Sequence, residues 1–242
     1  MRILGIRVDE YDMQAALARL TKLLEQPGQK EAAQVVTINP EGVMLAKADP
    51  ELQRIAEQAA LVTADGTGIL WAAEKLGKPL KERVTGIDLL EKLAEQAAKK
   101  GWKVYLLGAK PGIAEQAAAE LCCRYPGLQI AGMENGYFRD REEAVIEAIR
   151  RTEADILFAA LGMPFQEHWL YQHRKELGCR VSIGVGGSFD VLAGTVKRAP
   201  RLWQKLRLEW LWRLLSDPKR WRRYLAIPRF MQAVLREKKQ LR

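Results

Sequence analysis

The chain has 242 residues, of which 48% are hydrophobic, and this is enough for one sizeable α/β core but not for two. The cysteines, Cys122, Cys123 and Cys179, form neither a disulfide framework nor a metal-binding CxxC pattern. Charged residues close to the N-terminus leave no apolar core for a signal peptide, and no apolar run approaches the roughly 18 residues of a membrane-spanning helix. The composition therefore predicts a cytosolic protein that does not cross a membrane.

The net charge of +9 is unevenly distributed. Residues 197–242 hold fifteen Lys/Arg and three Asp/Glu, together with four of the seven tryptophans. The first 196 residues hold 24 basic and 27 acidic side chains and are mildly acidic. This division predicts a main domain at 1–196 and a basic appendage at 197–242 that suits a polyanionic surface.

Taken in chain order, short apolar runs alternate with segments of helical periodicity. The apolar runs predict strands at 2–8, 33–38, 61–64, 103–107, 129–131, 155–161 and 181–183. Helices are predicted to begin near Asp12, Asn39, Asp49, Asp65 and either Thr85 or Asp88. Further helices are predicted at 113–125, at 142–151 and in a segment that ends at Leu177. This alternation predicts a Rossmann-like, mostly parallel sheet with helices on both faces.

Polar residues and glycines follow most of the predicted strands. Ligands of parallel sheets bind at the carboxyl ends of the strands. We therefore expect one rim to be lined by Thr37, Asn39, Asp65, Gln166 and the loops at Gly108 and Gly186.

The segment after the strand at 181–183 contains Gly184, Gly186 and Gly187. Glycines at a strand end let the backbone approach a phosphate or nucleotide closely. A tight turn without a ligand is the alternative, and the spacing is not that of the G-x-G-x-x-G dinucleotide fingerprint. The pattern thus leaves both interpretations open and argues against a nicotinamide-dependent oxidoreductase.

Asp65 is the carboxylate best placed for chemistry, because it directly follows a strand and precedes Gly66 and Gly68. Asp-Gly-Thr-Gly is also a good helix N-cap, and spacing alone favours that role. Asn39, which precedes Pro40, has the same two interpretations.

Several other kinds of site are excluded. His168 and His173 lie five positions apart and do not share a helix face as two metal ligands would. The sequence has no Asp-x-Asp pair, no G-x-S-x-G motif and no phosphate-binding P-loop. We therefore expect a site without a metal or a cofactor.

The appendage combines aromatic and basic residues. Trp203, Leu206, Trp210 and Leu214 recur at intervals of three and four, and several arginines follow near Trp221. Such a pattern is typical of a helix that lies on anionic lipid. The alternatives are a tryptophan stripe packed on the main domain, or contact with nucleic acid.

Several segments together resemble the WecG/TagA/CpsF family of glycosyltransferases. They are T-I-N-P-E from Thr37, A-D-G-T-G from Ala64, R-V-T-G-I-D-L from Arg83, L-G-M-P-F-Q-E from Leu161, G-V-G-G-S-F-D from Gly184, and K-R-A-P from Lys197 followed by L-E-W-L-W-R-L. The resemblance implies an inverting, metal-independent transfer of an N-acetylmannosamine-type sugar from UDP to N-acetylglucosamine on a polyprenyl diphosphate, in the synthesis of wall teichoic acid or a related polymer. It also implies a catalytic domain at 1–196, a homodimer in solution, and a peripheral location on the inner face of the bacterial cell membrane.

The same resemblance implies roles for individual residues. Asp65 matches the general base, and the pocket residues are Thr37, Asn39, Arg83 and Gln166. UDP is expected at Gly186, Gly187 and Asp190, while Arg213, Arg220 and Arg223 of the appendage would meet its diphosphate. Phe165 departs from the family pattern, in which a lysine is common. The rival hypothesis is a non-catalytic nucleotide-binding or RNA-binding protein with a basic tail.

Overall fold

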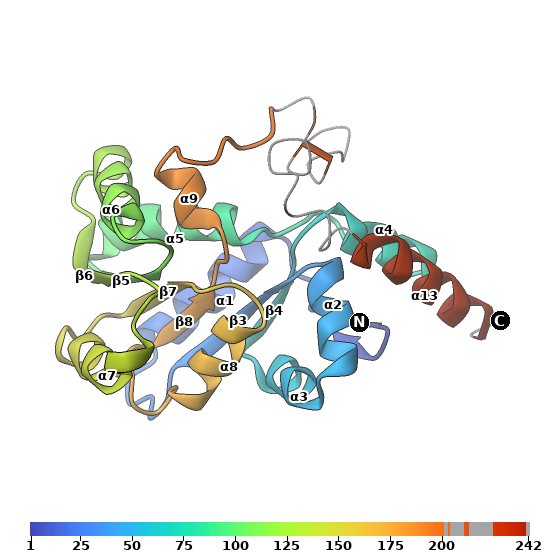
Figure 1. The fold of residues 1–242 in the computed structure, drawn as a ribbon, viewed down its shortest axis with the longest axis horizontal. Helices are drawn as coiled ribbons and strands as arrows, with labels where there is room; N and C mark the ends of the chain where they lie inside the picture. Colours follow the sequence, from blue (N-terminus) through green and yellow to red (C-terminus); the bar gives the residue numbers. More distant parts are fainter. Residues whose placement is uncertain (201–202, 204–210, 213–224, 241–242) are drawn as a thin grey trace.

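The computed structural model describes residues 1–200, 203, 211–212 and 225–240 of the chain. Its centre is a six-stranded parallel sheet with the strand order β4-β3-β8-β7-β5-β6 (Figure 1). The strands are β3 (Ala33–Ile38), β4 (Leu61–Ala64), β5 (Lys103–Gly108), β6 (Gln129–Glu134), β7 (Ile156–Ala160) and β8 (Val181–Gly184). The predicted Rossmann-like α/β class is therefore confirmed.

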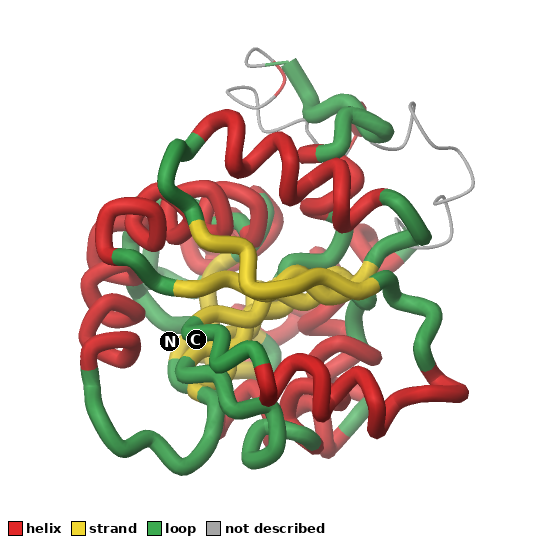
Figure 2. Tube along the Cα trace, turned by 90° about the vertical axis from the view of Figure 1, so that its left-hand side faces the viewer, coloured by secondary structure: helices red, strands yellow, loops and turns green. Residues whose placement is uncertain are grey.

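Helices cover both faces of this sheet (Figure 2). The first face packs against α1 (Met13–Glu25), α5 (Gly86–Lys100), α6 (Ile113–Arg124) and α9 (Ser188–Leu192). The second face packs against α2 (Pro40–Ala48), α3 (Pro50–Gln58), α7 (Glu142–Arg151) and α8 (Phe165–Gln172). A short 3-10 turn, η1 (Arg139–Arg141), precedes α7, and α4 (Thr67–Lys75) follows edge strand β4. Because both faces are covered, inner strands such as β7 are buried along their whole length.

The predicted caps are present at four helices. The side chains of Asp12, Asn39, Asp49 and Thr85 each accept a backbone N–H in the first turn of the helix that follows. Gly101 ends α5 in the left-handed conformation, at φ 73°. The sequence pattern was therefore a reliable guide to where these helices begin.

The predicted strand at 2–8 is wrong. The chain instead forms a small antiparallel hairpin of β1 (Arg2–Ile3) and β2 (Ile6–Arg7), which is separate from the central sheet. Leu4 and Gly5 both have positive φ, so the backbone reverses between the two apolar pairs. Smaller differences are a longer β6, which continues to Glu134, and an α8 that ends at Gln172 instead of Leu177.

The last described element, α13 (Ala226–Gln240), packs against α2 and α4 (Figure 1). Phe230 and Val234 are fully buried in the cluster that contains Ile3 and Ile6 of the hairpin, and Glu237 accepts the backbone N–H of Leu4 at 3.1 Å. This part of the appendage therefore contributes to the core of the main domain. The division at 196/197 stays a prediction.

Of the predicted tryptophan stripe, Trp203 lies within the described residues, whereas Leu206, Trp210 and Leu214 lie outside them. The Trp203 ring meets Trp212 edge-on at a centroid distance of 5.6 Å, and the Trp212 indole donates to the Lys197 carbonyl at 3.3 Å. No helix among the described residues combines the length and hydropathy that a membrane span requires.

Candidate functional site

The candidate site lies where β3 and β8 are neighbours in the middle of the sheet. The loop after β3 leads to α2 on the second face, whereas the loop after β8 leads to α9 on the first face. In open α/β sheets, ligands bind where loops diverge in this way, in a crevice outside the carboxyl ends of the two strands. Four adjacent strands, β4, β3, β8 and β7, bring Asp65, Asn39, Gly186 and Gln166 to this rim.

Asp65 is not the N-cap residue of the helix that follows it. The N-cap of α4 is Gly66, which has no side chain. The Asp65 carboxylate instead accepts the backbone N–H of Gly86, the first residue of α5, at 3.3 Å. The positive end of the α5 dipole favours a negative charge at this position. The predicted N-cap position is therefore off by one residue, and a half-buried carboxylate lies at the rim.

Gly86 also connects Asp65 to the neighbouring strands. A Cβ atom on Gly86 would lie 3.3 Å from Val185 Cα and 3.4 Å from the Thr37 hydroxyl oxygen. Thr37 is buried, and its hydroxyl donates to the Gly184 carbonyl at 2.7 Å. Thr37 thus links the ends of β3 and β8 directly beneath the crevice.

Asn39 caps α2, as the Asn-Pro pattern predicts. Its side-chain oxygen accepts the Gly42 N–H at 2.8 Å. The backbone beside it is tied to β4, because the Ile38 carbonyl accepts the Asp65 N–H at 2.8 Å. The cap uses the amide oxygen, so the amide NH₂ group is the part of Asn39 that could bind a substrate.

Gln166 joins two of the loops at the rim. Its side-chain oxygen accepts the N–H of Gly162 at 3.1 Å and of Gly186 at 3.2 Å. Its amide nitrogen donates to Glu167 Oε1 at 2.7 Å. With 2% of its surface exposed, Gln166 lies under the rim, where it shapes the loops around the crevice.

The remaining predicted residues take different places. Gly186 has φ +52°, with open space where a Cβ would be, and Asp190 lies in the first turn of α9, beside Gly187. Arg83 is half-buried and precedes Val84, whose N–H binds the Ala64 carbonyl.

Gly108 lies at the end of β5, on the far side of β7 from β8, and a Cβ atom there would overlap the Ala160 carbonyl. Close packing therefore explains this glycine without a ligand.

Arg213, Arg220 and Arg223 lie outside the described residues. The start of the appendage is described, and Arg198 forms an ion pair with Asp88 at 2.7 Å. Asp88 also accepts from the Thr85 hydroxyl at 2.6 Å, so this ion pair joins the appendage to the first turn of α5. Sequence reasoning missed this link, although both residues lie in segments that carry the family resemblance.

Glu167 is a second residue that sequence reasoning missed. It is 1% exposed, and burial raises the pKa of its carboxyl group to about 7. Its presence in the M-P-F-Q-E segment was the available signal, but acidic residues are seldom buried. No group of three or more His, Cys, Asp or Glu residues in the described part of the chain is arranged to hold a metal ion.

Comparison with known proteins identifies the family of the chain. The profile of the family described as "Glycosyl transferase WecG/TagA/CpsF family" matches residues 1–242. The N-acetylglucosaminyldiphosphoundecaprenol N-acetyl-beta-D-mannosaminyltransferase of Bacillus spizizenii is 37% identical over 211 residues, which cover 87% of this chain and 82% of the relative. The protein of the same name from Staphylococcus aureus is 37% identical over 208 residues, which cover 86% of this chain and 82% of the relative. The chain therefore belongs to the WecG/TagA/CpsF family of glycosyltransferases.

Proposed function

We propose that the protein transfers N-acetylmannosamine from a UDP-sugar to N-acetylglucosamine carried on a polyprenyl diphosphate, with inversion at the anomeric carbon. Family membership gives the reaction class, and the names of the relatives support the sugar and the acceptor. The observation that carries the proposal is the half-buried Asp65 carboxylate at the rim, where it accepts the backbone N–H of Gly86. The rival RNA-binding hypothesis is not favoured by these relatives.

Asp65 would act as the general base. Its carboxylate would accept the proton of the acceptor hydroxyl while that oxygen attacks the anomeric carbon. The new glycosidic bond forms as the bond to the UDP oxygen breaks, and UDP leaves with the electron pair on the opposite side. Gly86 N–H would hold one carboxylate oxygen, which orients the carboxylate toward the acceptor.

The other residues of the rim would bind and orient the two sugars and UDP. The Asn39 NH₂ group would donate to a sugar hydroxyl, while Thr37 and Gln166 would hold the strand ends in place. The backbone at Gly186 and Gly187 and the carboxylate of Asp190 would contact UDP. The leaving diphosphate gains negative charge, so cationic groups are needed beside it. Arg83, Arg213, Arg220 and Arg223 are the proposed cations.

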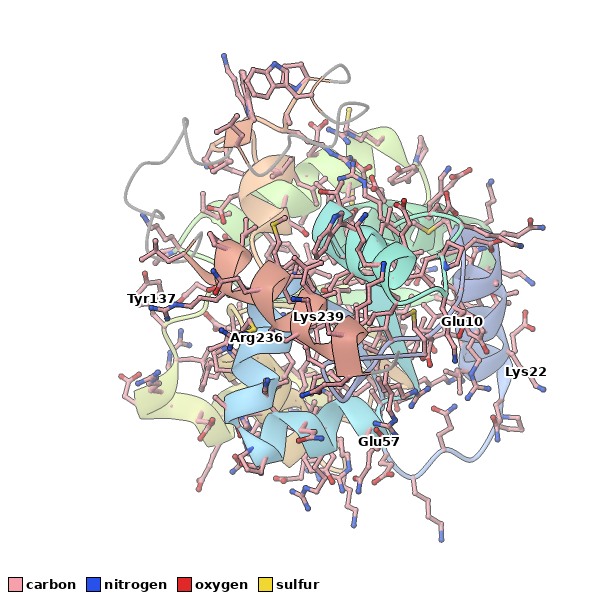
Figure 3. The ribbon with its side chains drawn as sticks, turned by 90° about the vertical axis from the view of Figure 1, so that its right-hand side faces the viewer. Glu10, Lys22, Glu57, Tyr137, Arg236 and Lys239 are labelled. Atoms are coloured by element: carbon pink, nitrogen blue, oxygen red, sulfur yellow. The ribbon has the colours of Figure 1, made fainter. Side chains whose placement is uncertain are left out.

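The acceptor lipid implies that the reaction takes place at a membrane surface. The outer side of α13 carries exposed Met231 and Leu235, and Arg236 and Lys239 lie on the same helix (Figure 3). Apolar side chains among cations suit the headgroup region of an anionic bilayer. We propose that the protein is peripheral on the inner face of the cell membrane and that it forms a homodimer in solution.

The direct test is a transfer assay with a polyprenyl-diphosphate-linked N-acetylglucosamine acceptor and a series of UDP-sugars. UDP-N-acetylmannosamine should give a disaccharide-lipid, and UDP-N-acetylglucosamine and UDP-glucose serve as controls. Activity should persist in excess EDTA. If no UDP-sugar is transferred and the protein binds an RNA oligonucleotide in a strongly salt-dependent way, the proposal is wrong and the RNA-binding hypothesis gains support.

A further inference from the structure

Glu167 is a buried acidic residue for which the proposed reaction has no use. It occupies the first turn of α8, and it forms no ion pair with any residue that the structure describes. Oε1 accepts from Gln166, whereas Oε2 is buried without a hydrogen-bond partner in the described part of the protein. A buried carboxyl group without a counter-charge lowers stability, and such groups are concentrated at functional sites.

The contacts of Gln166 define which way its amide group faces. One end of the amide faces the backbone N–H groups of Gly162 and Gly186, and these groups can only donate hydrogen bonds. The amide oxygen must therefore face these two groups, and the NH₂ group must face the other way. On that side it meets Glu167 Oε1, which accepts at 2.7 Å in either protonation state of the carboxyl group.

The Gln166–Glu167 pair also packs directly against the end of β8. A Cβ atom on Gly184 would come within 2.5 Å of Gln166 Nε2 and 2.9 Å of Glu167 Oε1. Thr37 binds the Gly184 carbonyl, and Gln34 Nε2 donates to the Glu167 carbonyl at 3.0 Å. The Val185 N–H also binds the Ala159 carbonyl of β7 at 2.8 Å. Contacts from β3, β7 and α8 thus converge on the short segment between Gly184 and Gly186.

We infer that Glu167 is a positioning residue, which holds the Gln166 amide in the one orientation that binds both the Gly162 and the Gly186 N–H groups and thereby fixes the two loops at the crevice. That these loops border the UDP site rests on the proposed function. The positioning itself depends only on the contacts within the protein.

Hydrogen exchange followed by NMR in the full-length protein tests the inference without any substrate. Glu167→Met removes the acceptor at nearly constant side-chain size, and the Gly162 and Gly186 amides should then exchange about tenfold faster, as expected for the loss of one hydrogen bond. The amides of Phe158 and Ile183 in the neighbouring strands should keep their rates. Ser182→Ala is the matched control, because it removes a buried, unpartnered oxygen from β8 without touching the pair.

Glu167→Gln provides a second variant of the same size in case Glu167→Met does not fold. Its amide can turn either end toward Gln166, so exchange at Gly162 and Gly186 should accelerate to an intermediate degree. Both variants should raise the KM for the UDP-sugar and leave the KM for the lipid acceptor unchanged. Wild-type exchange at Gly162 and Gly186, or equal acceleration at Ile183, would overturn the inference. A failure of sugar transfer would leave the exchange result unaffected, so the two proposals can be judged separately.

Discussion

At the scale of single residues, Asp65 is the side chain on which the proposed reaction depends most. Asp65→Asn keeps the size of the side chain and an oxygen for the Gly86 N–H, but it removes the basic group. Turnover should fall by roughly 10²–10⁴-fold, which is the usual effect of losing a general base. Initial rates of sugar transfer measure this, with thermal unfolding as the check on folding.

Asp12→Asn is the matched control for that experiment. It makes the same chemical change at a carboxylate that caps α1, and asparagine is also a good N-cap. Its turnover should stay close to wild type. An Asp65→Asn enzyme with turnover within a few-fold of wild type would remove Asp65 from the role of base.

Glu167 should give the folded protein a characteristic dependence on pH. Burial raises the pKa of this carboxyl group from 4.5 to about 7, so between these pH values the folded state binds more protons than the unfolded state. The contribution of Glu167 to stability therefore falls as pH rises from about 4.5 to about 7 and is constant above that. The total change is about 3 kcal/mol at most.

Urea unfolding of the wild type and of Glu167→Gln across this pH range measures the effect. The free energy of unfolding of the wild type, relative to that of the variant, should decrease toward pH 7. Glu143→Gln makes the same change at an exposed position of α7 and serves as the reference. A difference between wild type and Glu167→Gln that is the same at every pH would contradict the prediction.

At the scale of elements, α13 should stabilise the domain through two buried side chains. Phe230→Ala leaves a cavity in the cluster formed with α2, α4 and the N-terminal hairpin. The free energy of unfolding should decrease by about 3–5 kcal/mol, the usual cost of such a change. Leu235→Ala on the exposed side of the same helix is the control and should change it by less than about 0.5 kcal/mol. Equal effects of both changes in urea unfolding would mean that α13 is not docked in solution.

The elements that the sequence predicted best are those specified by local chemistry. Asn39-Pro40 and Asp49-Pro50 supply their own caps, and the β-branched residues at 33–38 form a buried strand as predicted. The hairpin at the N-terminus was missed because its turn needs a positive φ at Leu4. Leucine seldom adopts a positive φ, so the sequence does not indicate a turn at this residue.

The site was predictable as a list of residues but not as a set of contacts. Asp65 and Gln166 were correctly placed just beyond strand ends, where ligands of parallel sheets bind. One partner of Asp65 is the N–H of Gly86, which lies 21 residues away and is brought near by packing of α5. The burial of Glu167 likewise depends on how α8 lies on β8, and no local pattern in the sequence specifies that contact.

At the scale of the whole molecule, the charge difference between the main domain and the appendage predicts two separable effects of the appendage arginines. Each arginine near an anionic bilayer contributes about 1 kcal/mol to binding. Single changes of Arg213, Arg220 or Arg223 to alanine should therefore weaken liposome binding about fivefold, and should reduce sugar transfer further if these side chains also meet the UDP diphosphate.

Arg236→Ala is the control, because Arg236 lies on the described helix α13 and has no proposed part in the reaction (Figure 3). It should reduce transfer only as far as it reduces liposome binding. If the Arg213, Arg220 and Arg223 variants also lose sugar transfer only in proportion to their loss of liposome binding, these arginines act only in membrane attachment.

The docking of α13 also has a consequence for synthesis of the chain. Ile3 and Ile6 leave the ribosome well before Phe230 and Val234, which pack in the same cluster but are made more than 200 residues later. The central sheet ends at Gly184, so all of its strands are available before α13 exists. Folding should therefore proceed in two stages during translation. A nascent chain stalled near Pro200 would still expose the apolar surface between α2, α4 and the hairpin, and it would be a substrate for chaperones that bind apolar surfaces.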